Sequence, residues 1–193
     1  MLSFFHYLNS IHPIAPEAQA ALLGCVRQKT LRKAQVWLQE GAVCDKLTFI
    51  EKGLVKVYFE SGSKEVALWY NRENEIMLSV QSYFTQTPSQ FAIRAVEPCQ
   101  VFYVLHSDMH RLLQQYTELN INARVILQHY YGLSEAHVGL LLRSPRDRFE
   151  RIAEMYPWMV DGSRLTDRML AAYIGVTPAA VSQWRNGRNG KAA

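Results

Sequence analysis

Hydrophobic and polar positions follow two different patterns along the chain, and the changes of pattern divide it into segments. Apolar residues recur at helical spacing from about Leu2 to Val26, interrupted by Pro13 and Pro16, which predicts one or two short helices. From about residue 31 to residue 105, short runs rich in β-branched and aromatic residues, such as KLTFIEKG and LVKVYFES, are separated by turn residues. This second pattern predicts an antiparallel barrel or sandwich.

The pattern beyond Ser107 is helical again and continues to about Leu142. Its apolar positions follow an imperfect heptad path that includes Ile121 and Val125. Such a long helix needs a surface to cover it, which is either its own barrel or the same helix of a second copy, and we favour the second. The segment RSPRDR that follows predicts a hinge, because Pro145 can begin a helix but cannot continue one.

Two short helices joined at a glycine are predicted in the stretch LTDRMLAAYIGVTPAAVSQWR near the end of the sequence. Thr166 is placed to cap a first helix over 167–174, and Gly175 supplies the turn. Thr177 is placed to cap a second helix over about 178–185, with proline at its first position. The apolar positions of both helices would face one small core, as in a helix-turn-helix.

The net charge of +4 arises entirely in the last quarter of the chain. Up to Leu142 there are 12 basic and 12 acidic residues, whereas from Arg143 onward nine basic residues accompany five acidic ones. A neutral body with a basic C-terminal region favours a polyanion-binding protein. An ordinary solvated basic face is the other interpretation of the charge alone.

The order of short helices, β-roll, long helix and terminal helix-turn-helix resembles the Crp/Fnr family of bacterial transcription regulators. The stretch LTDRMLAAYIGVTPAAVSQWR is similar to the family's helix-turn-helix, and FIEKGLVKVYF, with Gly53 at the turn, is similar to its barrel signature. The resemblance implies an α+β fold. Its parts would be an N-terminal antiparallel cyclic-nucleotide-binding-like β-roll with flanking helices as sensor domain (1–115), a long dimerisation helix (116–142) and a C-terminal helix-turn-helix domain (143–193).

The same resemblance implies a homodimeric transcription regulator with double-stranded DNA as its partner. Gln183 is placed like the family's base-contacting residue and could pair with adenine, whereas Arg185 and Arg188, near the end of the helix, are expected to contact phosphates. The full set of expected DNA-binding residues is Thr166, Thr177, Ala179, Ser182, Gln183, Arg185, Asn186 and Arg188.

The barrel departs from the cyclic-AMP-binding members of the family at their phosphate cassette. In those members G-E-L is followed, after a short helix, by R-S or R-T, in which Glu binds the ribose hydroxyl and Arg the cyclic phosphate. Here Leu78, Ser79 and Val80 stand in place of the first motif, and Ser89 and Gln90 in place of the second. Without the arginine, a buried phosphate would lack its charged partner. We therefore expect no cyclic AMP binding of that kind, and an uncharged or hydrophobic effector if these residues bind one.

Catalytic, metal and cofactor sites are not indicated by the sequence. His106 and His110 have the spacing of metal ligands, but no H-E-x-x-H motif accompanies them. Cys25, Cys44 and Cys99 are widely spaced and contain no C-x-x-C, which argues against a disulfide framework or a metal cluster. We expect no enzyme, no metal and no cofactor. A barrel enzyme and a ligand-binding module whose C-terminal helices contact protein are the alternatives to the regulator.

Neither a membrane span nor a secretory signal is expected. No apolar run approaches the roughly 20 residues of a spanning helix. The N-terminal stretch MLSFFHYLNSIHPI lacks a basic start and a small-residue cleavage site. The sequence therefore predicts a cytoplasmic protein.

Overall fold

The computed structural model describes residues 2–62 and 64–189 of the chain. They form two compact units, one of residues up to Glu60 together with 68–128, the other of 61–67 together with 129 onward. The boundary between the units falls inside helix α5 (Thr117–Leu141). Each unit has its own buried core.

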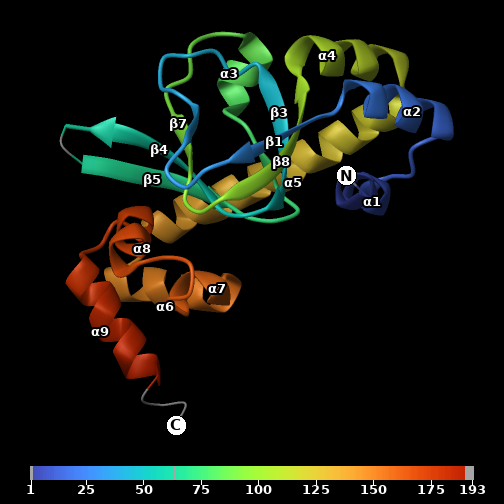
Figure 1. The fold of residues 1–193 in the computed structure, drawn as a ribbon. Helices are drawn as coiled ribbons and strands as arrows, with labels where there is room; N and C mark the ends of the chain where they lie inside the picture. The colour runs from blue at the N-terminus through green and yellow to red at the C-terminus, as the bar shows by residue number, and fades with distance from the viewer. Residues whose placement is uncertain (1, 63, 190–193) are drawn as a thin grey trace. The chain divides into compact units, whose positions relative to one another are not determined.

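The strands pair into two four-stranded sheets that make up the barrel (Figure 1). The first sheet has the order β1 (Arg27–Leu31), β8 (Cys99–Leu105), β3 (Lys46–Lys52), β6 (Ile76–Met77). The second has the order β2 (Val36–Leu38), β7 (Ala92–Ala95), β4 (Val55–Ser61), β5 (Lys64–Asn71). The strand pairs between β1 and β8, β3 and β8, and β4 and β7 are antiparallel, which confirms the predicted β-roll.

The two sheets enclose one apolar core. Ile50, Val57, Ile93 and Val101 are all buried there, and each comes from a different strand. Gly53 makes the turn from β3 to β4 at φ 111°, and a Cβ there would lie 2.6 Å from Sγ of Cys99. This position therefore requires glycine for both its backbone angle and its space.

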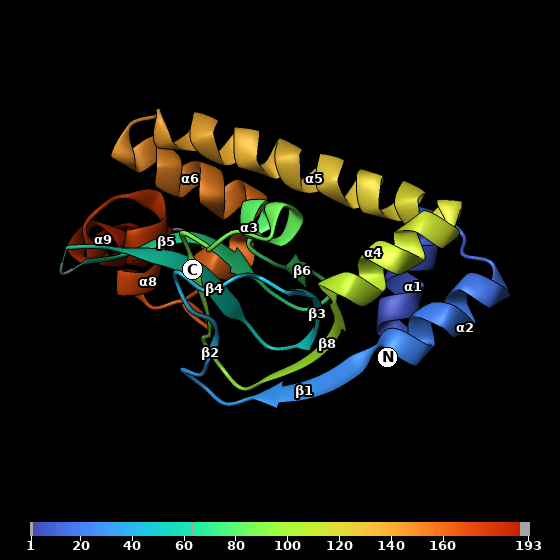
Figure 2. The same ribbon diagram turned by 90° about the horizontal axis from the view of Figure 1, so that it is seen from above.

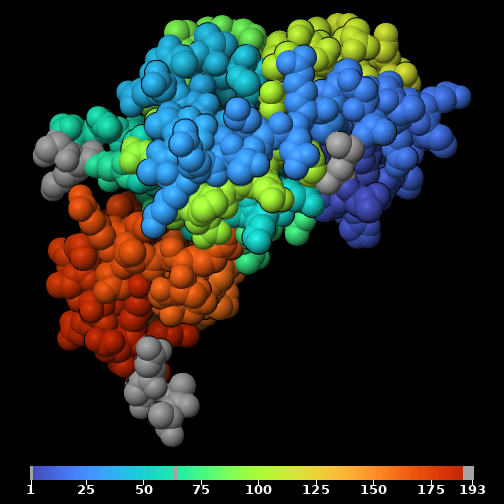
Figure 3. All heavy atoms as spheres, in the orientation of Figure 1, coloured from blue at the N-terminus to red at the C-terminus, as the bar shows by residue number. Residues whose placement is uncertain are grey.

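Strand β1 was not predicted from the sequence. Residues 27–30 are all exposed and only Leu31 is buried, so the strand has no alternating apolar face to reveal it. Its place is decided by pairing with β8, in which Lys29 lies opposite Val101. The blue surface around β1 lies on the outside of the barrel (Figure 3).

Helices α1 (Leu2–Ile11), α2 (Pro16–Cys25) and α4 (His106–Gln115) gather at one end of the barrel (Figures 1 and 2). Phe4 of α1 packs on Phe49 of β3 with 5.1 Å between ring centroids. The two leading helices were predicted, and Pro16 begins the second of them. The short helix α3 (Val80–Thr85) was not predicted from the hydrophobic pattern.

The helical pattern beyond Ser107 corresponds to two helices, because α4 ends before α5 begins, and the long helix expected over 116–142 is α5 (Thr117–Leu141). Tyr116 between them has extended backbone angles, φ −124° and ψ 107°. The side-chain amide of Asn120 donates to the carbonyl of Leu113, one of those left without a helical partner at the end of α4. Neither proline nor glycine marks this break, so helical periodicity alone could not locate it.

The C-terminal unit contains α6 (Pro145–Met155), α7 (Pro157–Val160), α8 (Asp167–Ile174) and α9 (Pro178–Asn189). Ser144 caps α6 by accepting from the backbone N–H of Asp147, and Pro145 opens the helix as predicted. The fully buried core of the unit comes from α6, α8, α9 and the loop before α8: Phe149, Ile152, Leu165, Leu170, Ile174 and Val181.

Candidate functional site

The helix pair α8 and α9 has the caps and the turn that the sequence predicted. The Thr166 hydroxyl accepts from the N–H of Met169, and that of Thr177 accepts from the N–H of Ala180, each at 3.3 Å. Gly175 ends α8 in the left-handed conformation, with φ 67°. The second helix is four residues longer than the expected end at 185. Both threonine hydroxyls are engaged by the caps, which places Thr166 and Thr177 at the helix starts.

The second helix presents an uncharged outer face. Ala179, Gln183 and Asn186 are exposed, and Ser182 is half-buried. These four residues occupy positions i, i+4, i+7 and i+3 of α9, so they follow one side of the helix. We call them the outer face of α9. It offers a methyl group, a hydroxyl and two carboxamides, which can donate and accept hydrogen bonds without any charge.

Arg185 lies on the opposite side of α9, one turn after the buried Val181. Its Nη1 is 2.5 Å from Oδ1 of Asp167, and its Nη2 donates to the carbonyls of Met159 and Leu165, each at 2.9 Å. The side chain is only 12% exposed. The phosphate contact expected of Arg185 would need its guanidinium to face outward, whereas in the structure this group ties α9 to the start of α8 and to the segment before it.

Arg188 lies one further turn along this inward side. Its Nη1 is 2.6 Å from Oε2 of Glu150 on α6, whose other carboxylate oxygen accepts from Arg146. The Arg188 side chain is 44% exposed, so the pair contributes about 0–1 kcal/mol. This arginine too is directed away from the outer face of α9.

The turn between α8 and α9 is held by a residue that the sequence analysis did not single out. Arg148 on α6 donates from Nη1 to the carbonyls of Ile174 and Gly175, at 3.0 and 3.2 Å. Its Nε donates to the carbonyl of Arg143 at 2.9 Å. A helix end leaves carbonyls without partners, and a guanidinium satisfies them with charge-assisted hydrogen bonds. No spacing motif links residues 26 positions apart, so the sequence carries no signal for this contact.

Most arginines of the C-terminal unit are engaged within the unit. Those with a carboxylate or carbonyl partner are Arg146, Arg148, Arg151, Arg185 and Arg188. Arg143 and Arg168 are exposed, and no ion pair joins either of them to another described residue. Of the arginines with such a partner, Arg148, Arg185 and Arg188 join different elements of the unit, whereas Arg146 and Arg151 form ion pairs within α6.

Two residues at the expected phosphate cassette, Ser79 and Ser89, hydrogen-bond to each other in the barrel. Ser79 directly precedes α3 and Ser89 follows that helix, and the Ser89 hydroxyl donates to the Ser79 hydroxyl at 2.8 Å. Both serines are buried. The backbone of Ser89 is fixed by its N–H to the carbonyl of Ala42 and by its carbonyl to the N–H of Gly41. The space between the two positions is thus closed by a direct contact.

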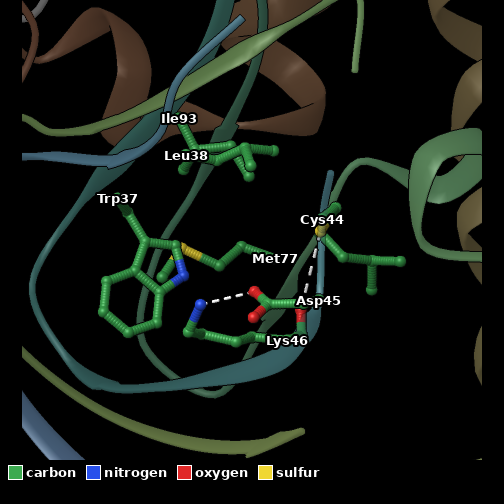
Figure 4. Close-up of a pocket in the computed structure, with 8 residues that line it drawn as sticks. Trp37, Leu38, Cys44, Asp45, Lys46, Met77 and Ile93 are labelled. Carbon is green, nitrogen blue, oxygen red and sulfur yellow. Dashed lines mark hydrogen bonds and ion pairs between the residues drawn. The ribbon is translucent and has the colours of Figure 1, made fainter. Parts of the chain in front are cut away.

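A shallow hollow lies beside this contact (Figure 4). Its volume is about 210 Å³, part of it open solvent. The lining residues are Trp37, Leu38, Cys44, Asp45, Lys46, Met77, Leu78 and Ile93. Of the five expected pocket residues only Leu78 lines it; Ser79 and Ser89 are buried, and Val80 and Gln90 are exposed.

The thiol in this hollow is not an activated one. Burial raises the pKa of the Cys44 thiol above its usual value. Its Sγ contacts the backbone carbonyl of Lys46 at 3.7 Å. A thiol that stays protonated at neutral pH is a weak nucleophile and is oxidised slowly.

Other chemistry-bearing groups do not assemble into a further site. The rings of His106 and His110 stack with centroids 5.9 Å apart. Within residues 2–62 and 64–189 no three side chains of His, Cys, Asp or Glu converge as a metal site would require. Over the same residues, no helix combines the length and the apolar character that crossing a membrane would need.

Comparison with known proteins begins with the barrel. Residues 28–116 match the model of the Cyclic nucleotide-binding domain family. No curated protein matches the chain in sequence.

Solved structures match over most of the chain. FixK2 from Bradyrhizobium japonicum has a TM-score of 0.74 at 17% identity, over 86% of each chain. A mutant of CooA from Carboxydothermus hydrogenoformans has a TM-score of 0.67 at 17% identity, over 88% of this chain and 79% of the other. The Catabolite Activator Protein of Thermus thermophilus has 0.58 at 17%, over 96% and 88%.

These matches confirm the resemblance to the Crp/Fnr regulators at the level of the fold. The alignments extend over 86 to 96% of this chain, so they include the C-terminal helices as well as the β-roll. At identities of 17%, the similarity shows a shared fold.

Proposed function

We propose that this chain is a homodimeric, DNA-binding transcription regulator whose barrel does not use the charged cyclic-phosphate cassette. The observation that carries the proposal is the outer face of α9, which stays exposed on the second helix of a capped and internally braced helix pair. A helix of this kind enters the major groove in helix-turn-helix proteins. The fold shared with Crp/Fnr regulators supports the same function.

Phosphate contacts are needed for affinity as well as base contacts for specificity. Arg143 and Arg168 are exposed cations of the C-terminal unit, and Arg168 lies in the first turn of α8. We assign phosphate contacts to Arg168 first, since a helix start also directs its free N–H groups outward. Arg185 and Arg188 are left out of the contacting set because of their partners within the unit.

Helix α5 supports the dimer. Its exposed apolar side chains include Leu127, Tyr131 and Val138, at 44, 65 and 60% exposure. They occur at i, i+4 and i+11 and so form one stripe, which we call the α5 stripe. Proteins that bind palindromic DNA through a helix-turn-helix are two-fold symmetric, so the partner that fits the stripe is a second copy of this chain.

Two exposed glycines on the same helix also support the dimer. A Cβ added at Gly132 or Gly139 would meet nothing within 4 Å. Glycine inside a helix costs about 1 kcal/mol relative to alanine, and nothing within the chain offsets this at either position. Close approach of a second helix accounts for both residues.

Selection of bound fragments from random DNA with the full chain tests the proposal, followed by titration of the selected duplex at several salt concentrations. We expect nanomolar-range, sequence-dependent binding whose logarithm falls linearly with log salt. A protein-contact module would show no salt-dependent affinity for any duplex, and that result would overturn the proposal.

A further inference from the structure

We infer that α9 recognises adenine-containing half-sites through two carboxamides, Gln183 and Asn186, and that neither arginine of α9 contacts guanine. This inference rests on the proposed DNA-binding function and adds the class of operator that it selects. The evidence is the division of α9 into an uncharged outer face and an inward side that holds both of its arginines.

The outer face has the groups that adenine requires. A carboxamide donates and accepts at once, so it can bind N7 and N6 of adenine together in the major groove. Gln183 and Asn186 are three residues apart, a rise of about 4.5 Å along the helix axis. Successive base pairs are separated by about 3.4 Å. The two amides therefore suit neighbouring base pairs of one half-site.

The remaining outer-face residues are compatible with the same sequence class. Ala179 is one turn before Gln183 and exposes only a methyl group, which can contact the methyl group of thymine. Ser182 is half-buried, and its hydroxyl accepts or donates to any base. Neither side chain favours guanine, so the whole face is suited to A·T pairs.

The arginines that could contact guanine are held elsewhere. Turning Arg185 outward would break its ion pair with Asp167 and remove donors from the carbonyls of Met159 and Leu165. Buried carbonyls and carboxylates that lose their hydrogen-bond partners lower the stability of the fold, so this rotation is unfavourable. Arg188 projects from the same side as Val181 and meets Glu150 on α6. Guanine recognition by Arg185 would require α9 to lose this bracing, whereas Arg188 would have to leave Glu150 and turn from the inward side of α9 to its outer face.

The test replaces each side-chain amide by a carboxylate of the same size, which accepts hydrogen bonds but cannot donate them. Gln183→Glu and Asn186→Asp keep the shape but only accept hydrogen bonds, and a carboxylate accepts from N4 of cytosine. Binding of the full chain is measured across duplexes with every base at each half-site position, at fixed low salt. Arg188→Gln is the matched control, because it changes a residue of the same helix that faces away from the outer face.

The wild-type chain should prefer adenine at two neighbouring positions by roughly 5- to 150-fold over the other bases. Gln183→Glu should shift the preference from adenine to cytosine at one position and Asn186→Asp at its neighbour, whereas Arg188→Gln should leave all preferences unchanged. A residue with only a structural role would not produce such a switch.

Three results would overturn the inference. They are a wild-type preference for guanine at those positions, unchanged preferences in both amide variants, and loss of preference in Arg188→Gln. Each of these presupposes sequence-dependent binding and leaves the proposed function standing. Absence of salt-dependent binding to every duplex would instead overturn both.

Discussion

The hydroxyl oxygens of Ser79 and Ser89 lie 2.8 Å apart. By the resemblance drawn from the sequence, these are the positions at which a cyclic-AMP-binding barrel would carry glutamate and arginine. The Ser89 hydroxyl also lies 2.7 Å from the carbonyl of Phe91, and both serines are 4% exposed or less. In those barrels the two positions bind the ribose and the phosphate, whereas here their two hydroxyl groups hydrogen-bond to each other. The cassette is thus part of the barrel's own packing.

Cyclic nucleotides should therefore not bind this barrel. A cyclic phosphate brought between Ser79 and Ser89 would break their contact and lose its hydration, and neither of these positions supplies a cation. Isothermal calorimetry of the full chain with cyclic AMP and with cyclic GMP should show no saturable heat in the micromolar range. A clear binding isotherm with either nucleotide would contradict this prediction.

Replacement of Arg148 by alanine should destabilise the C-terminal unit at the turn between α8 and α9. The change removes the donors to the carbonyls of Ile174 and Gly175, and we expect a loss of about 1–3 kcal/mol in the free energy of unfolding. Urea unfolding of the purified protein measures it. Arg151→Ala on the same helix removes an exposed pair with Glu154 and should change stability by no more than about 0.5 kcal/mol. Equal losses in the two variants would refute the capping role.

The stack of His137 on Tyr173 should make stability depend on pH. The two rings are nearly parallel, 16° apart, with centroids 4.6 Å from each other, and they join α5 to α8. Burial lowers the pKa of His137 below its usual 6.5. The unfolded chain therefore takes up this proton at a higher pH than the folded chain. The contribution of neutral His137 is complete above about pH 6.5 and is lost as the pH falls towards the folded pKa.

Comparison of the wild type with His137→Phe isolates this effect. Phenylalanine keeps an aromatic ring against Tyr173 but cannot take up a proton. The free energy of unfolding in urea, measured between about pH 5 and pH 7.5, should fall less steeply towards acid in the variant than in the wild type. Parallel pH profiles would show that His137 does not contribute.

A charge on the α5 stripe should produce monomers. Val138→Asp and Tyr131→Glu each place a carboxylate where we propose that a second copy packs, and both positions are well exposed, so the single chain should keep its fold. Sedimentation velocity should give a dimer for the wild type and a monomer for each variant, with weaker operator binding. Gln115→Glu, an exposed change on α4, is the control and should remain dimeric. Monomers that retained full affinity would argue against the dimer.

The sequence by itself determined the elements whose signals are local. Thr166, Gly175 and Thr177 mark the ends of α8 and α9 because a cap or a left-handed turn is made by the residue and its immediate neighbours. Ser144 and Pro145 mark the start of α6 for the same reason. Alternating apolar residues located most of the barrel strands, since burial on one face of a sheet repeats every second residue. The overall architecture followed from the order of these elements.

Only the tertiary structure decided which polar side chains stay available. Arg185 and Gln183 are two residues apart and equally hydrophilic in the sequence, yet one is braced by Asp167 while the other is exposed. The contacts of Arg185 and Arg148 join residues 18 to 27 positions apart, and that of Ser79 with Ser89 spans 10. Such partners are brought together by helix packing and sheet register. A sequence pattern reports periodicity along one element, whereas an ion pair depends on where a second element places its carboxylate.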